Sequence, residues 1–131
     1  MPRKSKPGII TIRDNANVWP HEIKSAKTLI KYGYDVEFLP ESKRKGEKRA
    51  DCHLDSVLWE MKAPRGATLD LVERNLRRAA KKSKNVIFDS RRIKKIPDNA
   101  IERELSVQLK SIKKINQIKF INRHAKIIDI T

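Results

Sequence analysis

The chain has 131 residues, and its 31 Lys or Arg against 16 Asp or Glu give a formal net charge of +15 at pH 7. This excess favours a polyanionic partner, nucleic acid above all, although a basic surface without such a ligand is the alternative. Cys52 is the only cysteine, which excludes an internal disulfide and a multi-cysteine zinc site, and it is expected to be buried in a strand. No run approaches the roughly 18 apolar residues of a membrane span.

The first third of the chain predicts a basic arm, a strand and a helix. Residues 1–8 carry three cations and two prolines and are expected to form a flexible arm, with a short strand over 9–12. Pro20 suits the first turn of a helix, where its missing N–H costs nothing. Gly33 suits the end of this helix, which is therefore predicted from Pro20 to about Tyr32.

The middle of the chain predicts a strand, a hairpin and a second helix. Residues alternate over 35–39, as in a strand, and the following loop, 40–49, holds five cations. Residues 50–62 predict two short strands joined by a tight turn at Asp55-Ser56, where Asp55 shapes the turn rather than binding metal. Thr68 is the predicted N-cap of the helix. The inner face of this helix is expected to consist of Leu69, Val72, Leu76, Ala79 and Ala80.

The last third predicts a strand, a helix and a hairpin. The apolar run 85–89 indicates a buried strand, and a helix is expected to begin near Pro97-Asp98. Strands over 118–121 and 126–130 complete the chain. The whole of 1–131 is thus expected to be one domain of the α/β or α+β class, with a central mixed sheet flanked by about three helices.

The hairpin over 50–62 brings three charged residues onto one face. If the turn is centred on Asp55-Ser56, Asp51 lies opposite Glu60, and Lys62, two residues further on, points the same way. Trp59 and Met61 then point to the other face and are expected to be core. A shift of one residue in the pairing would destroy this arrangement.

Two opposed carboxylates beside a lysine suit metal-dependent cleavage of a phosphodiester. A divalent ion, Mg²⁺ first and Mn²⁺ or Zn²⁺ as alternatives, is bound through one or two carboxylates together with phosphate oxygens and water. Asp51 and Glu60 are the predicted ligands, and Lys62 would orient the attacking water or neutralise developing charge. Glu22 could add a further ligand, directly or through water, if its helix packs on the sheet. An ordinary charge cluster on a solvated sheet is the alternative.

Several basic residues are candidates for contacts with the nucleic-acid backbone. His53 shares the face of Asp51, and His21 at the start of the first helix could touch a phosphate or simply be exposed. The cations of the second helix could equally form a solvated face. The predicted contact residues are Arg49, His53, Arg65, Arg74, Arg77, Arg78 and Lys81.

The order of a helix Glu, a strand Asp and a Glu-x-Lys on the paired strand resembles the PD-(D/E)XK nuclease superfamily. In this sequence those positions are Glu22, Asp51, Glu60 and Lys62, and Ala50 stands where the motif's name has proline. The resemblance implies a restriction-endonuclease-like core and a metal-dependent endonuclease in which Glu22 completes the site.

Residues 49–55, 59–64 and 85–89 more narrowly resemble the C-terminal nuclease domains of contact-dependent growth inhibition toxins. That group includes enzymes that cut tRNA, so structured RNA such as tRNA is the first expected substrate. DNA, cut by a resolvase-like enzyme or a DNase toxin, is the second, and a non-catalytic nucleic-acid-binding module is the rival class. The expected site of action is the cytoplasm, and no membrane partner is expected. If the chain is a toxin rather than a stand-alone enzyme, the resemblance implies an acidic immunity protein that covers its basic cleft.

Overall fold

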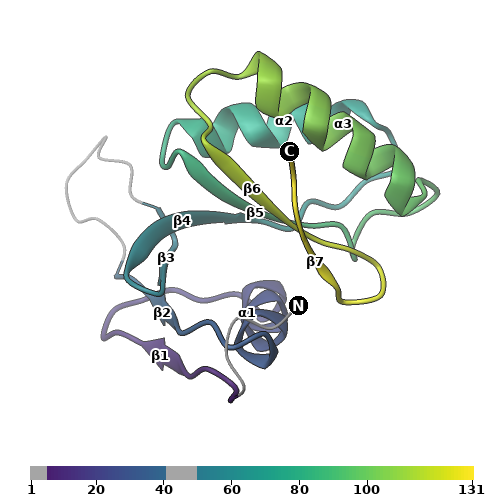
Figure 1. Ribbon diagram of the computed structural model, residues 1–131. Coiled ribbons are helices and arrows are strands. Elements are labelled where there is room, and N and C mark those ends of the chain that lie inside the picture. The colour runs from purple at the N-terminus through teal and green to yellow at the C-terminus, as the bar shows by residue number, and fades with distance from the viewer. Residues whose placement is uncertain (1–5, 41–49) are drawn as a thin grey trace.

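The computed structural model of the protein describes residues 6–40 and 50–131. Within these ranges, seven strands form one mixed sheet whose order follows the chain, and three helices pack on it (Figure 1). This confirms the predicted α+β fold with a central mixed sheet. The expectations for residues 1–5 and 41–49, including a phosphate contact by Arg49, lie outside the described residues.

The first half of the sheet contains the predicted hairpin. Strand β1 (Ile10–Ile12) runs parallel to β2 (Val36–Phe38). Strand β3 (Cys52–Leu54) lies antiparallel between β2 and β4 (Val57–Lys62). Strand β4 is therefore the junction between this half and the parallel half that follows.

The second half of the sheet is mostly parallel. Strand β5 (Asn85–Asp89) lies between β4 and β6 (Gln117–Ile121), parallel to both, and β7 (Ile127–Asp129) closes the edge antiparallel to β6. All five residues of β5 are buried, as expected for a central strand with both of its faces covered. The loops that follow β4 and β5 leave the sheet at the same edge.

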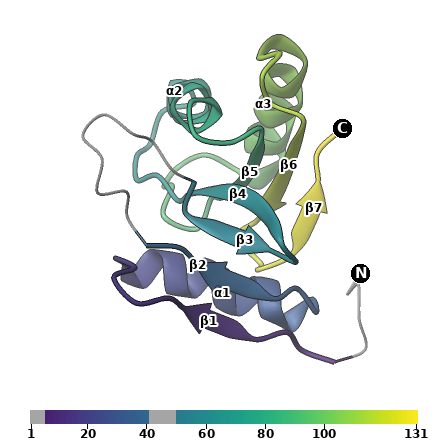
Figure 2. The same ribbon diagram turned by 90° about the vertical axis from the view of Figure 1, so that its left-hand side faces the viewer.

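The helices cover opposite faces of the sheet (Figure 2). Helix α1 (Pro20–Lys31) lies on one face, and Gly33, with φ +90°, follows its last turn as predicted. Helices α2 (Asp70–Ala80) and α3 (Asp98–Ser111) lie on the other face. Each face has its own apolar core, and Cys52, Trp59 and Met61 belong to the core beneath α1, as expected. No helix in the described ranges is long and apolar enough to cross a membrane.

The start of α2 differs from the prediction. Its N-cap is Leu69, which makes no side-chain capping bond, and not Thr68. Leu69, predicted to lie on the inner face, stands outside the helix and is 38% exposed, whereas Leu71 is buried beside the predicted Val72, Leu76 and Ala79. The backbone carbonyl of Thr68 accepts the N–H of Leu71 at the first turn.

Candidate active site

The β3–β4 hairpin has the predicted register. Cys52 pairs with Trp59, and the two turn residues Asp55 and Ser56 have φ of +48° and +70°. Two consecutive positive φ values are typical of the tight turns that join twisted antiparallel strands. This turn therefore determines which residues of β3 and β4 share a face.

Asp51 and Glu60 lie side by side where the pairing extends beyond β3. Asp51 Oδ2 accepts the backbone N–H of Met61 at 3.1 Å, which holds this carboxylate against the end of β4. Continuing the observed register by one residue places Asp51 opposite Glu60. The two carboxyl groups are close enough for the charge of Asp51 to raise the pKa of Glu60.

Glu60 is a buried acid with two lysines beside it. It is 1% exposed, and its Oε2 lies 3.6 Å from Nζ of Lys62 and 3.5 Å from Nζ of Lys82. Its Oε1 is buried and finds no hydrogen-bond partner in the part of the chain that the structure describes. Glu60 itself is therefore not part of a solvated sheet surface, although the lysines beside it remain partly exposed.

The environment of Glu60 disfavours its charge. Burial, reinforced by repulsion from Asp51, raises the pKa of Glu60 to about 7, although Lys82 and Lys62 act in the opposite direction. The carboxyl group is thus poised to exchange its proton near neutral pH. Acids with pKa values raised in this way are concentrated at functional sites.

Glu22 reaches the same neighbourhood from the N-terminus of α1. Its Oε1 accepts the backbone N–H of Trp19 at 2.9 Å, so that it closes the first turn of the helix. Burial raises the pKa of Glu22; the Trp19 N–H opposes this, and the charge of Asp51 adds to it. Glu22, the fourth predicted site residue, is therefore near Asp51, but its Oε1 already accepts the hydrogen bond that caps α1.

These carboxylates do not form a closed metal cage. In the described ranges, no group of three or more His, Cys, Asp or Glu residues is arranged to hold an ion. Asp51 and the unpartnered Oε1 of Glu60 nevertheless suit a cation such as Mg²⁺, which takes one or two carboxylates and completes its shell with phosphate and water.

The residues predicted to contact nucleic acid are distributed over two regions. Arg65 lies beside the candidate site, where it lines a cleft with Arg92. His53 is held by Glu37, whose Oε1 lies 3.0 Å from its Nδ1, so only Nε2 of this histidine is left for a phosphate, and its contact with nucleic acid stays a prediction. His21 lines the same cleft as Arg65.

The cations of α2 are exposed on its surface. Arg74 and Arg77 form ion pairs of 3.2 and 2.8 Å with the acids one turn earlier, and these exposed pairs stabilise the helix only weakly. Arg78 and Lys81 are exposed. All four remain predictions as nucleic-acid contacts.

Sequence reasoning missed Lys82 and an ion pair that fixes α1. Asp89 Oδ2 accepts hydrogen bonds from Ser25 Oγ at 2.7 Å and from Arg91 Nη2 at 2.6 Å. Arg91 also donates to Thr28 Oγ1 at 3.0 Å, so that the end of β5 is tied to α1. No local sequence pattern shows these contacts, because their partners come from different elements.

Comparison with known proteins places the chain in a family. The sequence model described as "Contact-dependent growth inhibition CdiA C-terminal domain" matches residues 48–127. A chain of the solved "CdiA-CT/CdiI toxin and immunity complex from Burkholderia pseudomallei" is similar with a TM-score of 0.69 at 20% identity, over 95% of this chain and 99% of that chain, and this likeness shows a shared fold. No curated protein matches. Because the family match spans more than half of the sequence, this chain belongs to the contact-dependent growth inhibition CdiA C-terminal domain family.

Proposed function

We propose that this chain is a toxin effector that hydrolyses phosphodiester bonds in nucleic acid with the help of a divalent metal ion. Structured RNA such as tRNA is the first substrate class and DNA the second. The observation that carries the proposal is the buried Glu60 carboxyl group, which lies beside Asp51 and Lys62 on a chain with a net charge of +15. Burying the Glu60 carboxyl group lowers the stability of the fold, and residues that are kept at such a cost commonly serve a function.

Each residue of the candidate site has a separate role in the proposed reaction. Asp51 and Glu60 would hold the ion, which supplies stabilisation of negative charge on the scissile phosphate when bound. Lys62, 3.6 Å from the Glu60 carboxylate, would orient the attacking water or neutralise developing charge. Lys82, close to the same oxygen, favours the ionised form of Glu60. Glu22 would act from α1 through its second oxygen.

The order of Glu22, Asp51, Glu60 and Lys62 on a helix, a strand and its paired strand supports a PD-(D/E)XK-type site. The toxin role is supported by the family match and by the structural neighbour, whose title names a toxin with its immunity protein. We extend this to an acidic immunity protein for the present chain, because a basic toxin surface attracts an acidic partner. The cytoplasm of a target cell would be the place of action.

A substrate panel tests this function. The protein is incubated with tRNA, duplex DNA and branched DNA, each without metal and with Mg²⁺, Mn²⁺ or Zn²⁺, and the products are separated by gel electrophoresis. We expect metal-dependent cleavage of tRNA. Cleavage of DNA alone would change the substrate class, and no cleavage of any substrate with any metal would refute the enzymatic role.

Variants separate catalysis from binding. Asp51→Ala and Lys62→Ala should abolish cleavage while leaving salt-dependent binding largely intact, since most of the affinity comes from other cations. Lys31→Ala, at the opposite end of α1 from Glu22, removes one exposed cation and serves as the matched control. A non-catalytic binding module would show no difference among the three variants.

A further inference from the structure

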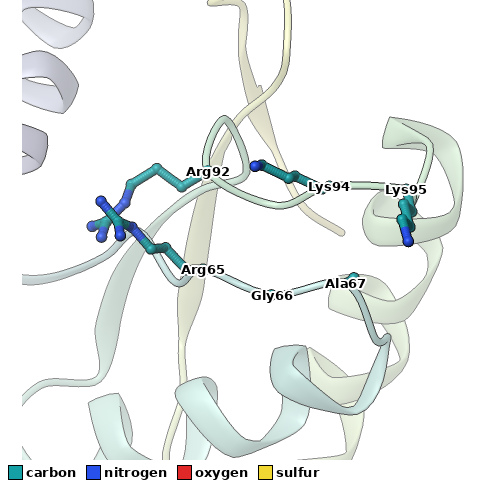
Figure 3. A pocket seen from close by; sticks show the side chains of 6 residues that line it. All are labelled: Arg65, Gly66, Ala67, Arg92, Lys94 and Lys95. Atoms are coloured by element: carbon teal, nitrogen blue, oxygen red, sulfur yellow. The ribbon is translucent and has the colours of Figure 1, made fainter.

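A basic cleft adjoins the candidate active site. It has a volume of about 700 Å³, which lies in the range of ligand pockets, and it opens between the N-terminus of α1 and the loops after β4 and β5. Its lining residues are Trp19, Pro20, His21, Lys24, Arg65 and Arg92. A second cavity of about 660 Å³ shares Arg65 and Arg92 and continues past Gly66 toward Lys94 and Lys95 (Figure 3). In the described ranges, no acidic residue lines either cavity.

The two arginines come from different loops, and their side chains converge (Figure 3). The loops are held together because Lys94 donates its backbone N–H to the carbonyl of Gly66 at 2.8 Å. Neither arginine forms an ion pair with another residue in the part of the chain that the structure describes. Converging guanidinium groups without a carboxylate repel each other and favour an anion between them, and phosphate suits guanidinium geometry.

The charges of the cleft and of the acidic site both act on His21, which lines the cleft. Burial, together with the charges of Arg92 and Arg65, lowers the pKa of His21, while Asp89 and Asp51 act on it in the opposite sense. His21 directly precedes Glu22 in α1, so the lining of the cleft is continuous in sequence with the acidic site.

An exposed aromatic side chain stands at the rim of the cleft. Trp19 is 58% exposed, whereas the other tryptophan, Trp59, is 3% exposed within the core. The backbone of Trp19 is fixed by its N–H bond to Glu22 and by Pro20, which follows it in the helix. A solvent-facing indole on a fixed backbone, beside arginines, is an arrangement that proteins use to stack an unpaired base.

We propose that this cleft binds one unpaired nucleotide next to the scissile phosphate, with its base stacked on Trp19 and its phosphates held by Arg65 and Arg92. The inference rests on the proposed function and narrows its substrate class. The substrate presents a single-stranded end, a loop or an extruded base rather than a continuous duplex. Glu22 connects the cleft to the acidic site, since its side chain caps the helix at Trp19 and is also near Asp51.

Binding of defined oligonucleotides tests the inference. A single-stranded RNA and a blunt duplex of the same sequence are titrated without metal, and the affinity is measured by fluorescence anisotropy. We expect Trp19→Ala to weaken single-strand binding about 10- to 100-fold, the loss expected for one stacked base, and to leave duplex binding nearly unchanged. Trp19→Phe should retain most of the affinity, because a smaller aromatic ring still stacks. Val107→Ala, which removes another exposed apolar side chain on α3, should have no effect.

A second measurement observes the stacking directly. Trp59→Phe leaves Trp19 as the only tryptophan, and its fluorescence should be quenched by the single strand more strongly than by the duplex. Equal losses for both oligonucleotides, or none, on Trp19→Ala would overturn the inference. If Asp51-dependent cleavage persists unchanged in Trp19→Ala, the inference fails and the proposed function stands. If no substrate is cleaved but Trp19→Ala weakens only single-strand binding, the cleft binds an unpaired nucleotide as inferred and the proposed nuclease function fails.

Discussion

The raised pKa of Glu60 makes a specific prediction for the stability of the protein. In the folded protein this pKa is about 7 instead of its ordinary value of 4.5, so the native state binds a proton that the unfolded chain releases. The free energy of unfolding therefore falls as pH rises through this window. At 1.36 kcal/mol per pH unit, the full loss is about 3 kcal/mol.

Replacing Glu60 by Gln removes the ionisation and keeps the shape. We expect Glu60→Gln to match the natural protein near pH 4.5, where both side chains are neutral, and to be more stable by about 3 kcal/mol near pH 8. Urea unfolding at several pH values measures this difference, because the midpoint shifts at constant m. Glu102→Gln, which changes an exposed acid on α3, should show no comparable dependence on pH.

The result that would refute this reasoning is equally specific. A Glu60→Gln variant that is less stable than the natural protein near pH 8 would mean that the lysines outweigh burial and repulsion. A difference that does not change with pH would mean that Glu60 titrates normally. A divalent ion binds the ionised form of Glu60 and therefore competes with the proton. Mg²⁺ should thus stabilise the natural protein more near pH 8 than near pH 5, and should stabilise Glu60→Gln less.

Three further changes test other parts of the structure. Lys82→Met removes a cation from the Glu60 carboxylate, so the pKa of Glu60 should rise further and the pH of half-maximal cleavage should increase; an unchanged pH profile would contradict this contact. Asp89→Asn leaves Arg91, whose side chain is 11% exposed, without its charged partner and should lower the free energy of unfolding in urea by about 3 kcal/mol, whereas full stability would argue against the tie to α1. Burial raises the pKa of the Cys52 thiol, so a thiol-specific dye should react only as the protein unfolds, and rapid labelling of the native state would speak against a closed core.

The part of the site that lies within one hairpin was predictable from sequence. Asp55 and Ser56 determine the turn, the turn determines the register, and the register places Asp51 beside Glu60 with Lys62 on the same face. These steps need no information about the rest of the fold. The same is true of β5, whose unbroken apolar run indicates a strand covered on both faces.

The remaining features depend on how distant elements pack. Lys82 belongs to a run of cations in which no local pattern distinguishes one lysine from the next, and only the packing of α2 brings it to Glu60. Likewise, the hairpin register predicts that Trp59 is core, whereas no local pattern shows that Trp19 faces solvent at the rim of a cleft. Thr68 is a good N-cap by residue type and therefore predicts a helix start one residue too early, because the structure does not use it as the cap.

The carboxylates of the candidate site can act on nucleic acid only because the protein carries an excess of positive charge around them. A pair of carboxylates repels an approaching phosphate, so acids of this kind can act on a polyanion only where nearby cations reverse the local field. Lys62 and Lys82 do so at Glu60 itself, and Arg65 and Arg92 extend the positive region into the adjoining cleft. The same cations cannot fully compensate the burial of Glu60, because its pKa stays raised. The free protein thus keeps an acid that is only partly ionised near neutral pH, and the binding of a further cation, together with substrate, would complete its ionisation.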